Sequence, residues 1–309
     1  MMYWTHWKSI LPLLLLTLGC GAQAEDQETH GEPVVATSIF PVGDLVESLV
    51  GDNARVEVVL PPGASPATFD VTPRQLADLR NSALFVLVGG GLDEWIVRLS
   101  NGDDHLLRLS DGITLIHSDD PGEEQAEDHG HSHAHGNPHI WLDPILVRDQ
   151  LLPKLERALQ AAIPDAAEEI RQRAGSLADS LTALDEEIRA ALEPLKGRAF
   201  IATHAAWTYF AHRYGLEEVG VIHPTPGHEP SSRDVADLIR TAEEKKVACL
   251  FIEPQLGEVA ARALATELSL PVRTLDPLGG PTLEGREGYM ALLRFNTEQL
   301  VKGLGDSGS

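Results

Sequence analysis

Histidine and carboxylate residues recur in this sequence at the points where short apolar segments end. His204 follows GRAFIAT, Glu253 follows ACLFI, and Asp276 follows PVRTL. His139 stands in NPHIWLDP, directly after a polar stretch. Imidazole nitrogens and carboxylate oxygens are ligands of zinc, which prefers four donors in tetrahedral geometry. Because these residues are far apart in sequence, they can form a metal site only if the fold brings them together.

A second group of histidines lies in an acidic, polar stretch at 117–138. It begins with His117, and the tract HGHSHAH then places an imidazole at every second residue, at His129, His131, His133 and His135. Short His-rich tracts bind transition metals, and the low apolar content indicates a solvated loop. We expect a weak, exchangeable zinc-binding loop, with a linker of no functional consequence as the alternative.

The segments around these residues alternate between two patterns. Short β-branched apolar runs predict strands, and apolar residues spaced by threes and fours predict helices. The strand patterns cover 34–40, 55–62, 83–91, 197–203, 217–222, 247–254 and 271–277, and the helix patterns cover 41–50, 72–82, 205–214, 231–246, 257–269 and 286–303. This alternation predicts parallel sheets covered by helices, with ligands bound beyond the carboxyl ends of the strands.

A long helical pattern at 149–195 interrupts this alternation. Apolar residues from Ile170 to Leu195 form one stripe, with Pro164 near its start and Pro194 near its end. We therefore predict an α/β fold of two lobes, each with a mainly parallel sheet flanked by helices, joined by a long connecting helix. The predicted parts are an export signal at 1–24, an N-terminal lobe at 33–148, the connecting segment at 149–195 and a C-terminal lobe at 196–309.

Length and charge limit the kind of partner. A chain of 309 residues favours two domains. The formal net charge of -23 excludes nucleic acid, whose phosphates require Lys and Arg. An acidic surface suits cation capture, although solubility alone also explains it. We expect a monomer.

The first residues have the pattern of an export signal. Lys8 precedes an apolar run at 10–18 that is too short to span a bilayer. Leu18-Gly19-Cys20 is similar to a lipobox, which would place a lipid on Cys20, although Thr17 stands where Leu is usual. Cleavage after Ala22-Gln23-Ala24 would instead release a soluble protein. Both interpretations place the protein outside the cytoplasm, either in the periplasm or anchored to the membrane as a lipoprotein.

Cysteine usage excludes a thiolate metal site. The chain has two cysteines, and the second, Cys249, lies in the apolar run VACLFI. We expect it to be a small buried side chain. With Cys20 removed or lipidated, neither an internal disulfide nor a zinc site made of several cysteines can form.

Several segments together resemble the zinc and manganese receptor family of ABC transporters, also called the metal-binding lipoprotein adhesin family. The matching segments are TSIFPVGDLVESLVGD, PPGASPATFDVTPRQLADL, NPHIWLDP, ATHAAWTYFAHRYGL, HEPSSRDVADLI, LFIEPQ and LDPLGG. They occur in the family's order across nearly all of the chain after the export signal. The resemblance implies two α/β lobes, a rigid connecting helix, a metal in the cleft between the lobes and delivery to an ABC permease without catalytic turnover.

The resemblance also implies three metal ligands, which are His139, His204 and Asp276. The family's fourth ligand is the histidine of a GxSPHxxxxTP segment, but this sequence reads GASPATFDVTP, with Ala67 at that place. Zinc is the expected metal, and Mn²⁺ or Fe²⁺ are alternatives. Losing one ligand should weaken the affinity or loosen the selectivity, because selectivity depends on ligand type and geometry.

The replacement for the fourth ligand stays open at this point. The candidates are water, Asp70, His135 from the polar loop, and His223 or His228 after the strand pattern EEVGVI. Glu253 is either a further ligand or a carboxylate that orients a histidine. A zinc hydrolase with three protein ligands, an open water position and Glu253 as general base is the alternative function.

Overall fold

The computed structural model describes residues 32–79, 81–97, 105–117, 136–223 and 230–305. These residues belong to one compact unit that begins at Glu32. The predicted export signal and most of the His-rich stretch, including His135, lie outside the described residues, and so does His228. None of the helices in the described ranges combines the length and apolar character needed to cross a lipid bilayer.

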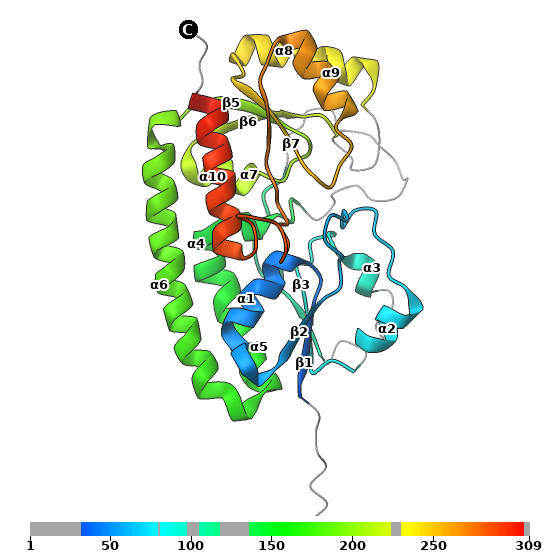
Figure 1. Cartoon of the computed structure of the whole chain (residues 1–309), viewed down its shortest axis with the longest axis vertical. Coiled ribbons are helices and arrows are strands. Elements are labelled where there is room, and N and C mark those ends of the chain that lie inside the picture. Colours follow the sequence, from blue (N-terminus) through cyan, green and yellow to red (C-terminus); the bar gives the residue numbers. More distant parts are fainter. Residues whose placement is uncertain (1–31, 80, 98–104, 118–135, 224–229, 306–309) are drawn as a thin grey trace, which may run out of the picture. The chain divides into compact units, whose positions relative to one another are not determined.

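The first half of the chain forms a four-stranded sheet in the order β2-β1-β3-β4, and every neighbouring pair of strands is parallel (Figure 1). All four residues of β3 are buried, as its uninterrupted apolar sequence LFVL predicts. The elements are β1 (Val34–Thr37), α1 (Phe40–Val50), β2 (Arg55–Val58), α2 (Pro73–Leu79), β3 (Leu84–Leu87), α3 (Glu94–Val97) and β4 (Leu106–Arg108).

The second half repeats this plan, with the order β6-β5-β7-β8 and parallel pairing throughout. Helix α8 has a capping box, in which the Ser231 hydroxyl accepts from the Asp234 amide and the Asp234 carboxylate accepts from the Ser231 amide. The elements are β5 (Ala199–Ala202), α7 (Thr208–Tyr214), β6 (Glu217–Val221), α8 (Ser232–Lys245), β7 (Cys249–Ile252), α9 (Val259–Leu268), β8 (Val272–Thr274) and α10 (Tyr289–Gly305).

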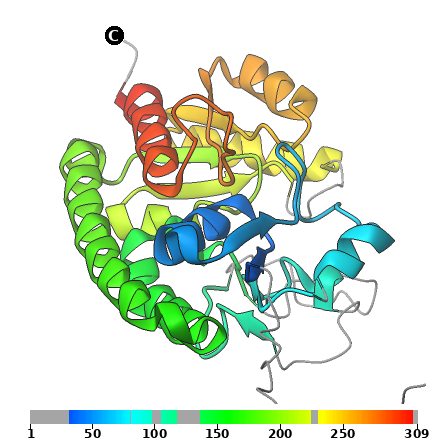
Figure 2. The same cartoon turned by 60° about the horizontal axis from the view of Figure 1, so that its bottom comes forward.

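The helical segment between the two sheets is a hairpin with one long arm. It contains short turns of helix at Ile140–Leu142, at α4 (Pro144–Leu146) and at Val147–Leu151, then α5 (Leu152–Ala162) and the 26-residue α6 (Ala167–Leu192). The chain reverses around Pro164, so that α5 packs against α6. Helix α6 also packs against α1 and α10, and it runs beside both in the two views (Figures 1 and 2).

The two halves share one hydrophobic core. The largest cluster of buried apolar side chains includes Val35 of β1, Leu184 of α6 and Phe251 of β7. The apolar stripe predicted for the long helix supplies part of this core, because Ile170, Leu181, Leu184, Ile188 and Leu192 are all buried. The long helix therefore joins the two sheets through side-chain packing.

The predicted fold class is confirmed, with differences at the level of single elements. The long helix α6 begins just after Pro164 and ends just before Pro194, as predicted, and α5 precedes it in the same helical segment. Strand β4 is absent from the predicted set, since three residues at a sheet edge carry too short a pattern. The helix expected at 205–214 begins later, at Thr208.

Candidate metal centre

The imidazole rings of His139 and His204 face each other, although the two residues come from different parts of the chain. The Nε2 atoms of His139 and His204 lie 3.1 Å apart, and the ring centroids are separated by 4.9 Å. Two nitrogen ligands of one tetrahedral zinc ion, each about 2.0–2.1 Å from the metal, lie about 3.3 Å apart. The observed separation therefore matches two ligands of one ion.

The opposite ring nitrogens are both held by acceptors. Nδ1 of His139 lies 2.8 Å from Oδ1 of Asn137, and Nδ1 of His204 lies 2.7 Å from the carboxylate of Glu253. An acceptor at Nδ1 assigns the proton of a neutral imidazole to that nitrogen, which leaves the Nε2 lone pair for a metal. Both rings thus turn Nε2 toward each other, and Glu253 orients His204.

The sheet explains why His204 and Glu253 are neighbours. His204 follows β5 and Glu253 follows β7, and these two strands pair in parallel. Their carboxyl ends lie at the same edge of the sheet, where open α/β sheets bind ligands. The Thr203 hydroxyl fixes the same edge, because it donates to the Phe251 carbonyl at 3.1 Å.

Asn137 connects the loops that carry the two histidines. Its Oδ1 accepts from the backbone amide of His139 at 3.0 Å as well as from the ring. Its Nδ2 donates to the carbonyl of Ala205 at 2.6 Å and to the hydroxyl of Thr208 at 3.1 Å. One amide side chain therefore holds His139 in place relative to the residue after His204.

Two carboxylates make this region electronegative. Burial lowers the pKa of His204, but the charge and hydrogen bond of Glu253 and the charge of Glu218 outweigh burial and raise it above its ordinary value. Burial raises the pKa of Glu218 to about 7, against the hydrogen bond from Thr208 and the charge of His204. Oε1 of Glu218 is buried and has no hydrogen-bond partner among the described residues. The region is suited to accept positive charge.

Asp276 is fully buried and engaged by other groups. Its Oδ1 accepts from Gln255 Nε2 at 2.8 Å and from the amides of Leu278 and Gly279 at 3.0 Å each. Its Oδ2 forms an ion pair with Arg286 at 2.8 Å. Its backbone amide donates to Asn296 on α10 and its carbonyl accepts from the same residue, so six hydrogen bonds hold Asp276.

Trp141 links Asp276 to the histidine pair. Its indole ring packs against His139, with ring centroids 5.0 Å apart, and its Nε1 donates to the carbonyl of Pro277 at 2.8 Å. The carbonyl of Trp141 accepts from the hydroxyl of Tyr289 at the start of α10. His139 and the residue after Asp276 are therefore separated by one buried indole.

The other predicted ligands are placed differently. His223 is buried after the end of β6, whereas Asp70 and Ala67 are exposed in the segment after β2. His135 and His228 lie outside the described residues. Within the described ranges no three or more His, Cys, Asp or Glu side chains are grouped so that they could hold one ion. The structure brings His139 and His204 together, and Glu253 contacts the far side of the His204 ring. Asp276 stays a predicted ligand.

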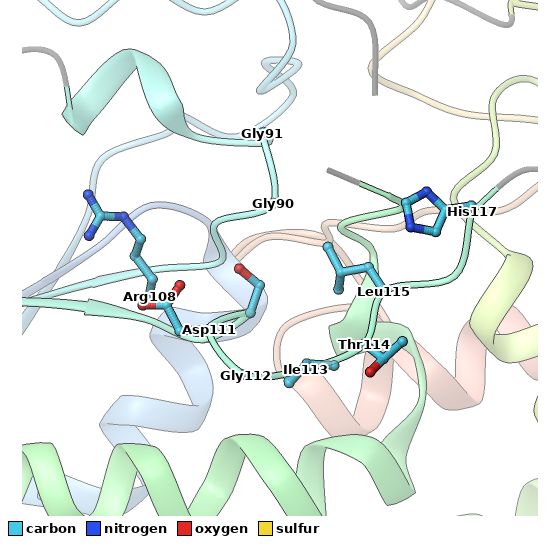
Figure 3. A pocket seen from close by; sticks show the side chains of 10 residues that line it. Gly90, Gly91, Arg108, Asp111, Gly112, Ile113, Thr114, Leu115 and His117 are labelled. Carbon is cyan, nitrogen blue, oxygen red and sulfur yellow. The ribbon is translucent and has the colours of Figure 1, made fainter. Parts of the chain in front are cut away.

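A cavity of about 460 Å³ lies between the loop after β3 and the segment from Arg108 to His117 (Figure 3). Arg108 and Asp111 lie on one side of it and His117 on the other, and Gly90 and Gly91 form part of its rim (Figure 3). Neither histidine of the pair lines this cavity. It is a separate feature from the paired imidazoles.

Three residues of the site were not among those predicted from the sequence, namely Asn137, Glu218 and Arg286. Asn137 stands two residues before His139 in the motif NPH, which is a detectable signal. Glu218 and Arg286 carry no such signal, because their partners lie ten residues away across a loop, beyond the reach of a helix or strand period.

The comparisons with known proteins agree with this fold. The model of the family described as zinc-uptake complex component A, periplasmic, matches residues 35–303. The chain belongs to this family.

Individual members of the family and its relatives are similar at modest identity. The zinc-binding lipoprotein AdcA of Streptococcus pneumoniae serotype 4 is 26% identical over 303 residues, covering 94% of this chain and 60% of AdcA. A protein of Thermotoga maritima is 30% identical, covering 87% of this chain and 92% of that protein. A crystal structure of ZnuA has a TM-score of 0.74 at 28% identity, covering 88% of this chain and 98% of the ZnuA chain. The chain therefore spans less than two thirds of AdcA.

Proposed function

We propose that this chain is an extracytoplasmic receptor that binds zinc at His139 and His204 and delivers it to the permease of an ABC importer. The observation that carries the proposal is the meeting of two Nε2 atoms at 3.1 Å, each ring being held by an acceptor at Nδ1. Neutral imidazole suits zinc better than the hard cations that prefer oxygen ligands. Membership of the family and the names of AdcA and ZnuA support zinc as the cargo.

We propose Asp276 as the third ligand and water as the fourth. Asp276 would supply a negative charge, and it lies one residue from the carbonyl that anchors Trp141 against His139. Ala67 has no donor atom and is exposed. An incomplete protein cage should bind Mn²⁺ or Fe²⁺ more weakly than zinc, following the order of affinities of divalent metals for one ligand set.

We further propose that residues 1–24 direct export, with a lipid on Cys20 as the membrane anchor, and that the chain acts as a monomer with lobes at 33–148 and 196–309. The family description as periplasmic supports export. A receptor of this kind performs no turnover. The hydrolase alternative has no support from the family or from the named relatives, which are zinc-uptake and zinc-binding proteins.

Zinc titration by calorimetry tests the proposal. His139→Ala and His204→Ala should each abolish the tightest zinc equivalent, since each removes one of two converging ligands. His212→Ala is the matched control, because His212 is an exposed histidine on α7. Tight zinc binding that survives in both single variants and in the double variant would show that the cargo site lies elsewhere.

A further inference from the structure

Arg286 forms an ion pair with Asp276, and a set of metal ligands alone does not explain why a positive charge lies there. Its Nη1 lies 2.8 Å from Oδ2 of Asp276, and the side chains are 19% and 0% exposed. The guanidinium carbon also lies 4.8 Å from the centroid of the Phe295 ring. A partly buried cation therefore lies against the fully buried carboxylate that we propose as a ligand for another cation.

The loop after Asp276 turns back on itself and brings Arg286 into contact with this carboxylate. The amide of Arg286 donates to the carbonyl of Leu283 at 2.8 Å, and its own carbonyl accepts from the amide of Gly280 at 3.2 Å. Gly279, with φ of 63°, adopts a left-handed conformation that favours glycine. The ion pair is thus supported by backbone hydrogen bonds on both sides.

Both oxygens of Asp276 are occupied. Oδ1 accepts three hydrogen bonds, from the Gln255 side chain and from the amides of Leu278 and Gly279, which saturates its lone pairs. Oδ2 is the oxygen left for a metal, and Arg286 is bound to it. A dication can bind Asp276 through Oδ2 only if the guanidinium moves away or shares this oxygen.

We infer that Arg286 is an internal counter-ion that competes with the metal for Asp276 and so lowers the affinity of the site. This inference rests on the proposed function. Without the metal, Arg286 compensates the buried negative charge of Asp276, because a buried carboxylate without a partner is costly. When the metal binds, it takes the place of the guanidinium at Oδ2. Arg286 is thus a positioning residue that sets how readily the cargo is released.

The direct test replaces the charge and keeps the length of the side chain. Arg286→Met should tighten zinc binding by about 5- to 100-fold, the usual range for coupling between two sites, in competition with a zinc chelator. Arg286→Lys keeps the positive charge and should stay near the wild-type affinity. Arg294→Met is the control, because Arg294 lies on the following helix α10 in an exposed pair with Glu187.

A double-mutant cycle separates competition from simple charge repulsion. In an Asp276→Ala background, Arg286→Met should leave the zinc affinity unchanged, since the two cations no longer share an oxygen. Equal tightening in both backgrounds would overturn the inference, because Arg286 would then weaken zinc binding by charge repulsion and not by competing for Asp276. Unchanged or weaker zinc binding by Arg286→Met in the wild-type background would also overturn it.

A measurement on the wild-type protein covers the case in which Arg286→Met does not fold. One equivalent of zinc should shift the Arg286 Nε–H resonance in the NMR spectrum, with Arg286→Lys identifying that signal. No shift at zinc saturation would overturn the inference. If the wild-type chain binds no zinc tightly, the proposed function fails as well, whereas zinc binding that depends on His139 with no effect of Arg286 removes this inference alone.

Discussion

The two imidazoles owe their orientation to the groups behind them. Glu253 holds Nδ1 of His204 and Asn137 holds Nδ1 of His139, so each Nε2 faces the other ring. Such partners tune the basicity and orientation of a ligand, and their loss usually lowers metal affinity by about 10- to 100-fold. The residues behind the ligands should therefore be nearly as important for zinc as the ligands.

Substitutions of Glu253 test this dependence. Glu253→Gln keeps an acceptor but removes the charge and should weaken zinc binding about tenfold, whereas Glu253→Ala should approach a loss of about 100-fold. Chelator competition measures both affinities. Glu258→Gln is the control, because Glu258 is an exposed carboxylate paired with Arg262. Wild-type affinity in Glu253→Ala would mean that His204 is oriented by other contacts.

The pH dependence of zinc binding follows from the same contact. The charge and hydrogen bond of Glu253, together with the charge of Glu218, outweigh burial and raise the pKa of His204. Zinc must displace this proton, so the affinity should fall as the pH is lowered through the raised pKa, by about tenfold per pH unit for one proton. Glu253→Gln removes the charge that raises the pKa of His204 most, so zinc affinity should begin to fall only at a lower pH. Zinc titrations between pH 5 and pH 8 measure it, and a flat profile would contradict the protonation scheme.

Residue types and the strand ends predicted part of this site. His204, Glu253 and Asp276 follow strand patterns in the sequence, and the structure places each after the end of a parallel strand. Side-chain pairings across loops had no such signal, so the ion pair of Arg286 with Asp276 and the hydrogen bond of Thr208 with Glu218 were not predicted. Hydrogen bonding at this level depends on loop conformations that periodicity does not describe.

At the scale of elements, helix α10 holds the edge of the second sheet that carries Asp276 and Glu253. Asn296 of α10 accepts from the backbone amide of Asp276 at 2.8 Å and donates to its carbonyl at 2.7 Å. Close to the end of the helix, Gly303 lies directly against β7. A Cβ at Gly303 would lie 2.7 Å from Cζ of Phe251 and 2.8 Å from Sγ of Cys249. Only a residue without a side chain lets the helix come this close to the strand.

Gly303→Ala should therefore lower the free energy of unfolding by about 1–3 kcal/mol, because extra atoms in a packed core force neighbours to shift. Gly305→Ala is the matched control on the same helix, since its Cβ would meet no atom within 4 Å. It should be neutral or slightly stabilising. Urea denaturation gives both values through the midpoint at constant slope. Equal stability of the two variants would show that α10 can shift away from β7 without cost.

The alternation of strand and helix patterns predicted most elements, because buried strands and amphipathic helices have strong periods. Strand β3 (LFVL) and the apolar stripe of α6 are examples. Short edge elements such as β4 were missed, and the helix expected at 205–214 begins later, at Thr208. Their boundaries depend on tertiary packing, which a local pattern records poorly.

At the scale of the whole molecule, the two sheets are joined by one core. Val35 of the first sheet, Leu184 of α6 and Phe251 of the second sheet belong to the same cluster of buried side chains. Removing either sheet would expose apolar surface on the other half and on α6. The described chain from Glu32 is accordingly one compact unit.

This shared core predicts cooperative unfolding. Calorimetry should give a single thermal transition with equal calorimetric and van't Hoff enthalpies. A free zinc concentration 100 times the dissociation constant should add about 2.7 kcal/mol to the stability and raise the melting temperature of the whole transition. Two separate transitions, only one of them sensitive to zinc, would mean that the halves unfold independently.

The central claim is that one metal ion is held by Nε2 of His139 and Nε2 of His204. Anomalous diffraction at the zinc absorption edge, on crystals of the zinc-loaded protein, tests this claim most directly. The account predicts an anomalous peak about 2.0–2.1 Å from both Nε2 atoms, with Asp276 as the nearest carboxylate ligand. A strongest zinc peak bound to neither of these two nitrogens would contradict it.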